Sequence, residues 1–222
     1  MSEQIKSQFI SALEFRHACK EFDSERKISP SDFDFILQSM RLAPSSFGLE
    51  PWQFVVIQDM TLREKIKEHA WGGQNQIPTA SHFVVAMHNK GAGLRYDGPL
   101  FDEYLFKRRE LPPEMEEKYR GFVEQFQEND FDLLQSQRNL DDWAGKQIYI
   151  PLAHMLIAAA MLKIDSCPME GFNRVEVGKL LADELAIDAE VYSPAFLIAF
   201  GYRKNQQPNK LRRSLDSLVK WA

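Results

Sequence analysis

The feature that most constrains the fold is a long apolar stretch in the second half of the chain. It runs from Ile148 to Leu162 and reads IYIPLAHMLIAAAML, with a proline and a histidine inside it. A helix that crosses a bilayer needs roughly 20 apolar residues. The stretch is shorter than that, so it is better interpreted as a buried helix. It is also long for the core of a monomer, which makes it a candidate for contact with a second chain.

Composition excludes several classes of protein. The 222 residues are 44% hydrophobic and 27% charged, which excludes disorder as the main state. A net charge of -5 argues against general electrostatic binding to nucleic acid or anionic lipid, so we expect neither nucleic acid nor a membrane as a partner. Two cysteines, Cys19 and Cys167, cannot build a disulfide framework, and the start MSEQIKSQFI has no secretory apolar region. Both observations favour a cytoplasmic location.

The local patterns alternate between helices and strands. Apolar spacing predicts helices at 4–17, from Ser29 to about 43, and at 61–70, 142–163, 174–186 and 214–221, with a charged, helical region over 99–145. β-Branched and aromatic runs predict strands at 52–58, 82–88, 164–167 and 195–202. These patterns indicate α+β or α/β, with one central sheet covered on both faces. No linker is visible, so residues 1–222 are expected to form one domain.

The familiar motifs of several enzyme classes are missing. The sequence contains no GxSxG, GxGxxG or GxxxxGK[ST] segment, so hydrolase, Rossmann and P-loop interpretations lack support. No histidine stands at zinc-ligand spacing from a cysteine, and no metal site is expected.

What remains is a scattered set of elements suited to anions and flat rings. Two basic clusters, Arg16–Lys20 and Lys210–Arg213, lie beside element ends, where phosphate sites form. Small hydroxyl residues follow Pro44, and a turn over 168–172 leaves a strand with a glycine that permits close backbone approach. Each element alone is equally consistent with a solvated surface.

In this order and spacing, the elements resemble the FMN-dependent nitroreductase family, closest to its oxygen-insensitive NAD(P)H nitroreductase and dihydropteridine reductase branch. The resemblance spans about 9–213 and is carried by Arg16–Phe22, Ala43–Ser46, Glu50–Phe54, Gln74–Gln76, Ala80–His82, Trp143, Lys146–Gln147, Pro168–Phe172, Gly201–Arg203 and Lys210–Arg212. It implies an α+β fold with a central mixed β-sheet wrapped by helices, and an intertwined homodimer with two FMN sites at the interface.

The resemblance also implies roles for individual residues. Arg16, Lys210 and Arg212 would bind the FMN phosphate, and Lys20 would lie at the N1 edge of the flavin. Backbone N–H groups of 170–171 would face N5 and O4, while residues 44–46 would come from the other subunit. The implied cofactor-binding positions are Arg16, His17, Ala18, Lys20, Pro44, Ser45, Ser46, Gln74, Asn75, Gln147, Pro168, Met169, Glu170, Gly171, Lys210 and Arg212.

Some positions depart from the family pattern. Ala18 replaces a hydroxyl residue, Phe47 and Gly48 replace a small polar pair, and Glu50 stands where glutamine is common. The 99–131 region does not align and corresponds to the family's variable lid. Phe47, Phe122 and Phe126 are therefore only candidates for substrate contact.

The resemblance implies an enzyme in which NADH or NADPH gives hydride to flavin N5 and a small-molecule acceptor then takes two electrons. Nitroaromatics, quinones and pterins are the expected acceptors, ping-pong kinetics follow from one shared site, and no covalent nucleophile is needed. Two alternatives stay open. One is a dimeric flavin-binding scaffold without turnover. The other is a branch with different FMN chemistry, such as dehalogenation or flavin fragmentation.

Overall fold

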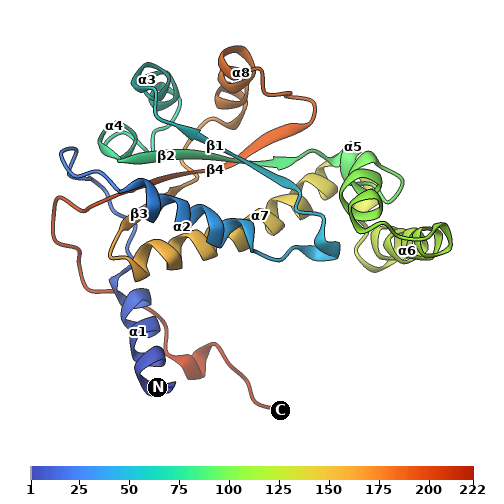
Figure 1. Ribbon diagram of the computed structural model, residues 1–222, viewed down its shortest axis with the longest axis horizontal. Helices are drawn as coiled ribbons and strands as arrows, with labels where there is room; N and C mark the ends of the chain where they lie inside the picture. Colours follow the sequence, from blue (N-terminus) through green and yellow to red (C-terminus); the bar gives the residue numbers. More distant parts are fainter. Residues whose placement is uncertain (1) are drawn as a thin grey trace.

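The computed structural model describes residues 2–222 and places a four-stranded sheet between two layers of helices (Figure 1). The strands are β1 (Trp52–Ile57), β2 (His82–Asn89), β3 (Asp165–Met169) and β4 (Tyr192–Gly201). They are ordered β1-β2-β4-β3. All four expected strands are confirmed, and the fold class is α+β.

The pairing within the sheet is antiparallel, whereas the resemblance implied a mixed sheet. Each of the three neighbouring pairs of strands is antiparallel. Within residues 2–222 the one parallel pairing is an isolated bridge between Ala18 and Ser166. The chain after the first helix therefore runs beside β3 in the same direction, but only for a single bridge.

The register between β2 and β4 shifts at Pro194. Ala86 pairs with Phe196 and Met87 with Pro194, so Ala195 is the extra residue of a β-bulge. Proline has no backbone N–H to donate to a ladder, which is why strands that contain it commonly carry a bulge there.

The α-helices are α1 (Ser2–Phe15), α2 (Pro30–Arg41), α3 (Met60–Glu68), α4 (Gln76–Thr79), α5 (Gly91–Leu94), α6 (Pro113–Gln125), α7 (Gln137–Met161) and α8 (Arg174–Leu185). Short 3-10 or π turns occur at η1 (Ser46–Gly48), η2 (Phe101–Lys107), η3 (Phe126–Asp130), η4 (Leu133–Gln135) and η5 (Leu215–Ser217). The helix starting after Ser29 is confirmed, with the Ser29 side chain accepting from the Asp32 N–H.

Two sequence expectations about helices need correction. The predicted helix at 214–221 is wrong, because only the single 3-10 turn η5 forms there. Its apolar side chains are exposed, so no packing within the chain stabilises a longer helix. The helical region 99–145 is broken into η2, α6, η3 and η4 before α7 begins. Pro112 and Pro113 separate η2 from α6.

Each face of the sheet packs on its own helical layer. On β2, Phe83, Val85 and Met87 face the core beneath α3 and α8, while Val84 and Ala86 face the core against α2 and α7. This alternation is the period-2 pattern of a strand that is buried on both faces. Figure 1 shows α3 and α8 on one side of the sheet and α2 and α7 on the other.

The long apolar stretch lies in the second half of α7. Pro151 lies inside the helix and is buried together with Ile148, Leu152 and Met155. Of the helices within 2–222, none combines the length and the apolar character that crossing a membrane requires. The buried-helix interpretation is confirmed.

A third apolar cluster lies beyond the sheet, at the far end of α7. It joins α5, η2, α6 and the start of α7 around buried residues such as Phe101, Phe106 and Trp143. Figure 1 shows this helical lobe as a separate projection. It corresponds to the 99–131 region that the sequence could not align.

His82, at the start of β2, provides a test of this packing. Its ring stacks on Phe33 of α2 with a centroid separation of 3.8 Å. Burial, with smaller contributions from Arg63 and Lys27, lowers the pKa of His82 to about 4. The folded state therefore holds the imidazole neutral. Stability is complete above the unfolded pKa of about 6.5 and is lost as the pH falls from there towards 4.

We expect His82→Phe to reduce this loss by about 1–2 kcal/mol, a figure discounted because the ring is only half buried. Urea unfolding of both proteins at pH 7 and pH 4.5 gives the two differences in free energy. Equal losses in the two proteins would show that His82 does not control the acid response.

Candidate functional site

A cluster of cationic side chains lies where the end of α1 meets the C-terminal segment. The Lys210 ammonium donates to the Leu13 carbonyl at 2.7 Å and also to the Arg16 carbonyl. Burial, together with the nearby charge of Arg212, lowers the pKa of Arg16. Burial, followed by the charges of Lys210, Arg203, Arg16 and Arg212, lowers the pKa of His17. The structure thus brings together both basic clusters, 194 residues apart in the chain.

This cluster is not neutralised by ion pairs. Among residues 2–222, the ion pairs involve neither Arg16 nor Lys210 nor Arg212. Arg203 differs, because its guanidinium lies 2.6 Å from the buried Asp165 carboxylate. Guanidinium and ammonium groups are the side chains that proteins commonly use to contact phosphates.

The segment after the cluster follows β3. The Cys19 N–H donates to the Ser166 carbonyl at 3.0 Å, so Lys20 follows the point where this segment meets β3. Burial raises the pKa of the Cys167 thiol, while the charge of Lys20 and a hydrogen bond from Gln76 oppose the rise. Lys20 itself is exposed. The charge of Lys20 therefore acts on Cys167, the residue that precedes Pro168.

The glutamines of 74–76 have different roles. Gln74 donates to the Lys67 and Ala70 carbonyls at 2.8 and 2.9 Å and so caps the end of α3. Gln76 is buried, and its amide lies 3.8 Å from the Cys167 sulfur. The sequence analysis named Gln74 and Asn75 as site residues and left out Gln76. The start of α4 at Gln76, which turns that side chain inward, was not visible in the sequence.

The turn over 168–172 is fixed by a close contact between two glycines. The Gly72 N–H donates to the Gly171 carbonyl at 2.8 Å. A Cβ atom on Gly171 would lie 3.0 Å from the Gly72 Cα and 3.0 Å from the Trp71 indole. The glycine is therefore required for the approach of the 70–73 loop, and the turn is left with its backbone exposed beside Met169.

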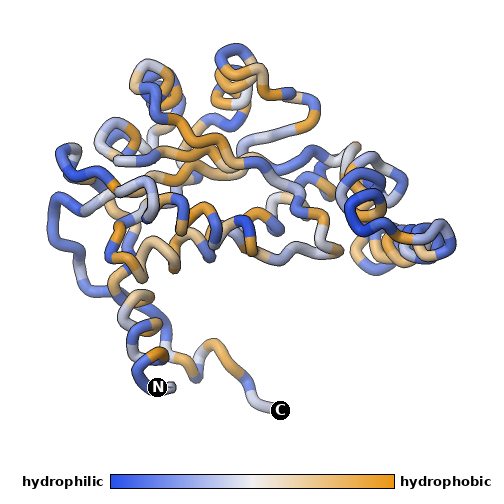
Figure 2. The backbone as a smooth tube through the Cα atoms, viewed as in Figure 1, coloured by the Kyte–Doolittle hydropathy of each residue, from blue (hydrophilic) through white to orange (hydrophobic). Residues whose placement is uncertain are grey.

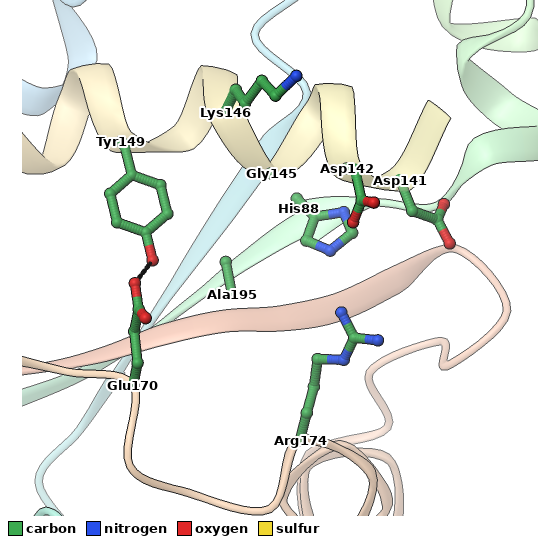
Figure 3. Close-up of a pocket in the computed structure, with 9 residues that line it drawn as sticks. All are labelled: His88, Asp141, Asp142, Gly145, Lys146, Tyr149, Glu170, Arg174 and Ala195. Carbon is green, nitrogen blue, oxygen red and sulfur yellow. Dashed lines mark hydrogen bonds between the residues drawn. The ribbon is translucent and has the colours of Figure 1, made fainter. Parts of the chain in front are cut away.

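The side chain of Glu170 links this turn to α7. The Tyr149 hydroxyl donates to the Glu170 carboxylate (Figure 3). Burial, and then this hydrogen bond and charge, raise the pKa of Tyr149. The turn is thus anchored from both sides, by Gly72 and by Tyr149.

The 44–48 loop lies away from the cationic cluster. The Ser46 N–H donates to the Gln147 side chain at 2.8 Å, and the Glu50 N–H donates to the Ser45 hydroxyl at 2.8 Å. Phe47 and Gly48 both have positive φ values, 56° and 68°. In Figure 1 this loop lies near the helical lobe, whereas the cationic cluster lies at the opposite end of α7. Within one chain, the two groups of predicted site residues do not meet.

The three phenylalanines named as substrate contacts also separate. Phe47 and Phe126 pack edge to face with a centroid separation of 5.1 Å, in the core of the helical lobe. Phe122 is 59% exposed and borders Lys118. Phe122 is therefore the only one of the three with a largely free ring.

The glycine contact gives a testable consequence. We expect Gly171→Ala to lower the free energy of unfolding by about 1–3 kcal/mol, because the added methyl group must displace backbone. The matched control is Gly121→Ala on α6, where nothing lies within 4 Å. That change should raise the free energy of unfolding by about 0.5–1 kcal/mol through helix propensity. Urea titrations measure both, and equal effects would contradict the close approach.

Comparison with known proteins agrees with this geometry. The model of the nitroreductase family matches residues 13–202. YfkO of Bacillus subtilis, named as an NAD(P)H nitroreductase, is 43% identical over 218 residues, covering 98% of this chain and 99% of YfkO. A similarly named protein of Staphylococcus haemolyticus, SH0546, is 43% identical and covers 98% of each chain.

Solved structures show the same fold. The nitroreductase ydfN of Bacillus subtilis superposes with a TM-score of 0.79 at 22% identity, covering 98% of this chain and 100% of ydfN. A nitroreductase of Exiguobacterium sibiricum, solved in complex with FMN, has a TM-score of 0.74 at 19% identity, with 96% and 97% coverage. The chain belongs to the nitroreductase family.

Proposed function

We propose that this chain is an FMN-dependent oxidoreductase that uses NADH or NADPH to reduce small electron-poor molecules. The observation that carries the proposal is the unneutralised cluster of Arg16, Lys210 and Arg212 at one end of β3, with Lys20 and the 168–172 turn towards the other. Five residues of β3 span about 16 Å, a distance suited to a molecule with a phosphate at one end and a ring at the other.

The cluster fits the phosphate of FMN. Arg16 and Arg212 offer planar guanidinium groups for bidentate contacts, and Lys210 adds a third positive charge from the same segment. The resemblance assigned a hydroxyl to position 18, which is Ala18 here. Across the bridge from it, the buried Ser166 hydroxyl has no hydrogen-bond partner within 2–222. The absence of a hydroxyl at position 18 removes one polar contact and leaves the cationic cluster unchanged.

The other half of the site fits a flat ring. Pro168 is partly exposed and offers an apolar surface, whereas Met169 is 5% exposed and packs in the core beneath α3 and α8. The backbone N–H groups of Glu170 and Gly171 would be the donors at the ring edge. The glycine pair packs closely and fixes the course of this turn. Lys20 would supply positive charge at the pyrimidine edge. Asn75, which is exposed, is the amide proposed for hydrogen bonds at that edge.

When bound, FMN would supply two-electron hydride chemistry. The chain's own residues then act by positioning and electrostatics. Lys20 favours a state in which negative charge develops beside it. Donor and acceptor use one site in turn, which gives ping-pong kinetics. Nitroaromatics, quinones and pterins are the acceptor classes proposed, and no residue serves as a covalent nucleophile.

Two copies of the chain would complete each site. The 44–48 loop and the cationic cluster lie at opposite ends of α7, so a site that uses both draws on two chains. Exposed apolar side chains support this: Phe9 and Ile10 on α1 are 43% and 52% exposed, and Leu215 and Trp221 are 72% and 91% exposed. Figure 2 shows α1 and the C-terminal tail extending away from the body, with hydrophobic (orange) segments along the tail. A homodimer would bury them.

The purified protein tests the proposal directly. We expect a yellow protein with about one FMN per chain that bleaches under anaerobic NADH or NADPH, and a light-scattering mass of two chains of 25.7 kDa. A colourless protein that FMN does not reconstitute would refute FMN binding. A yellow protein that neither donor bleaches would support the scaffold alternative, and a loaded monomer would refute the two-chain site.

The two ends of the proposed site should respond differently to substitution. Arg212→Ala removes a charge-assisted contact to a dianion, so FMN affinity should fall about ten- to a hundredfold, while weak riboflavin binding changes little. Lys20→Ala should weaken FMN binding only modestly but lower the reduction potential of the bound flavin. The Lys20 charge mainly stabilises the negative charge that the flavin carries after reduction.

Titration of apoprotein with FMN and riboflavin, together with a redox titration of each variant, measures these effects. Arg213→Ala is a matched control, because this arginine adjoins Arg212 and is exposed. Normal FMN affinity in Arg212→Ala and an unchanged potential in Lys20→Ala would show that the assigned positions are wrong.

A further inference from the structure

The segment 44–50, which extends the 44–48 loop by two residues, has an unusual backbone. Phe47, Gly48 and Glu50 all have φ values in the left-handed region, 56°, 68° and 48°. For a residue other than glycine this conformation is unfavourable, and it persists only where the surrounding structure imposes it. Contacts made by this segment must therefore hold Phe47 and Glu50 in place.

The side chain of Phe47 enters the core of the helical lobe. Its ring packs edge to face on Tyr119 of α6 and Phe126 of η3, with centroid separations of 6.3 and 5.1 Å, and lies 6.4 Å from the Phe101 ring of η2. Leu49, two residues farther on, is fully buried in the same core. The 44–50 segment thus supplies two apolar side chains to a core that otherwise belongs to the lobe and α7.

The end of η2 contacts the segment from its polar side. The Arg108 guanidinium donates to the Glu50 carboxylate at 3.0 Å. A Cβ atom on Gly48 would lie 2.5 Å from the Arg109 Nη2 atom, so that guanidinium rests against the glycine. An exposed ion pair contributes little to stability, whereas packed aromatic pairs contribute more. Phe47 is therefore the main attachment, and the arginines add to it.

The same segment is also bound to α7. The Ser46 N–H donates to the Gln147 side chain at 2.8 Å. One turn earlier on α7, the Trp143 ring lies 6.0 Å from the ring of Phe126. The contacts of Ser46, Gln147, Trp143, Phe126 and Phe47 therefore form a closed ring that joins the segment, α7 and the lobe. Removing Phe47 opens this ring between the segment and the lobe.

These contacts account for the positions at which the sequence departs from the family pattern. Phe47, Gly48 and Glu50 each meet the lobe, through a ring, a backbone surface and a carboxylate. Ser45 and Ser46, which fit the pattern, come directly before them. The departures are thus explained as an attachment to the lobe, and the Phe47 ring is engaged there instead of in contact with an acceptor.

We propose that Phe47 is a positioning residue that couples the helical lobe to Ser45 and Ser46, so that the docked lobe sets where these serines lie. Without the Phe47 ring the left-handed backbone loses the contacts that impose it, and the serines lose their fixed position. The inference rests on the proposed function, because that function places 44–46 beside the flavin bound to a second copy of the chain.

Hydrogen exchange of the purified protein tests the docking. Phe47→Ala should speed amide exchange about tenfold in the 44–50 segment and in lobe peptides over 113–131, because each loses its contact with the other. Phe47→Leu keeps an apolar side chain and should restore much of the protection. Met115→Ala is the matched control, because Met115 is an apolar residue of α6 that is 49% exposed and lies outside the lobe core. Unchanged exchange over 113–131 in Phe47→Ala would overturn the docking.

A double-mutant cycle on FMN affinity tests the coupling to the flavin site. Phe126 belongs to the lobe, yet Phe126→Ala and Phe47→Ala should each weaken FMN binding about three- to tenfold, with a changed visible spectrum of the bound flavin. The double variant should bind no more weakly than the weaker single variant, because both changes break one contact. Met115→Ala should bind FMN as wild type does.

The outcomes separate this inference from the proposed function. Wild-type FMN affinity and spectrum in Phe47→Ala, or single effects that multiply in the double variant, would overturn the positioning role while FMN binding itself stands. A wild-type protein that binds no FMN would refute the proposed function and the positioning role together. Hydrogen exchange would still decide whether Phe47 docks the lobe.

Discussion

The ion pair between Arg203 and Asp165 holds together the three chain segments on which the candidate site is built. Asp165 begins β3 and is 3% exposed, and Arg203 follows β4. The same guanidinium donates to the Phe15 carbonyl at 3.1 Å and lies 4.1 Å from the Phe15 ring centroid. A buried carboxylate without this partner would be strongly destabilising, so the end of α1, the start of β3 and the end of β4 are tied to one another.

The position of the cationic cluster follows from that pair. Because Arg203 holds the end of α1, Arg16 and His17 leave the helix beside the C-terminal segment, where Lys210 completes the contact. The Ala18–Ser166 bridge then sets the direction of the chain towards Cys167. The cationic cluster is thus positioned by backbone bonds and one buried ion pair rather than by contacts among the cations, which repel one another.

Much of the fold could be predicted from local pattern, and the reasons are specific. Strand β2 is buried on both faces, so its sequence is a continuous apolar run, and α2 carries a serine cap followed by proline. The site was harder to predict, because the role of each side chain depends on where the folded chain points it. Gln74 and Gln76 have the same side chain two residues apart, yet one caps α3 and the other is buried near Cys167. A cleft next to Glu170 (Figure 3) joins residues from β2, α7 and α8, and no spacing along the chain reveals it.

Several arginines of this acidic chain can be compared by their partners. Arg63 is buried and donates to the Ile57 and Ala80 carbonyls at 2.8 Å each, and Arg203 pairs with Asp165. Both arginines therefore stabilise the fold. Arg16, Arg212 and Arg174 have no such ion-pair partner within 2–222, although the chain carries five more acids than bases. Acidic side chains are abundant, and pairing any of these arginines would require only a nearby carboxylate. Because Arg16 and Arg212 stay unpaired, their positive charge is free to contact the phosphate of the proposed FMN site.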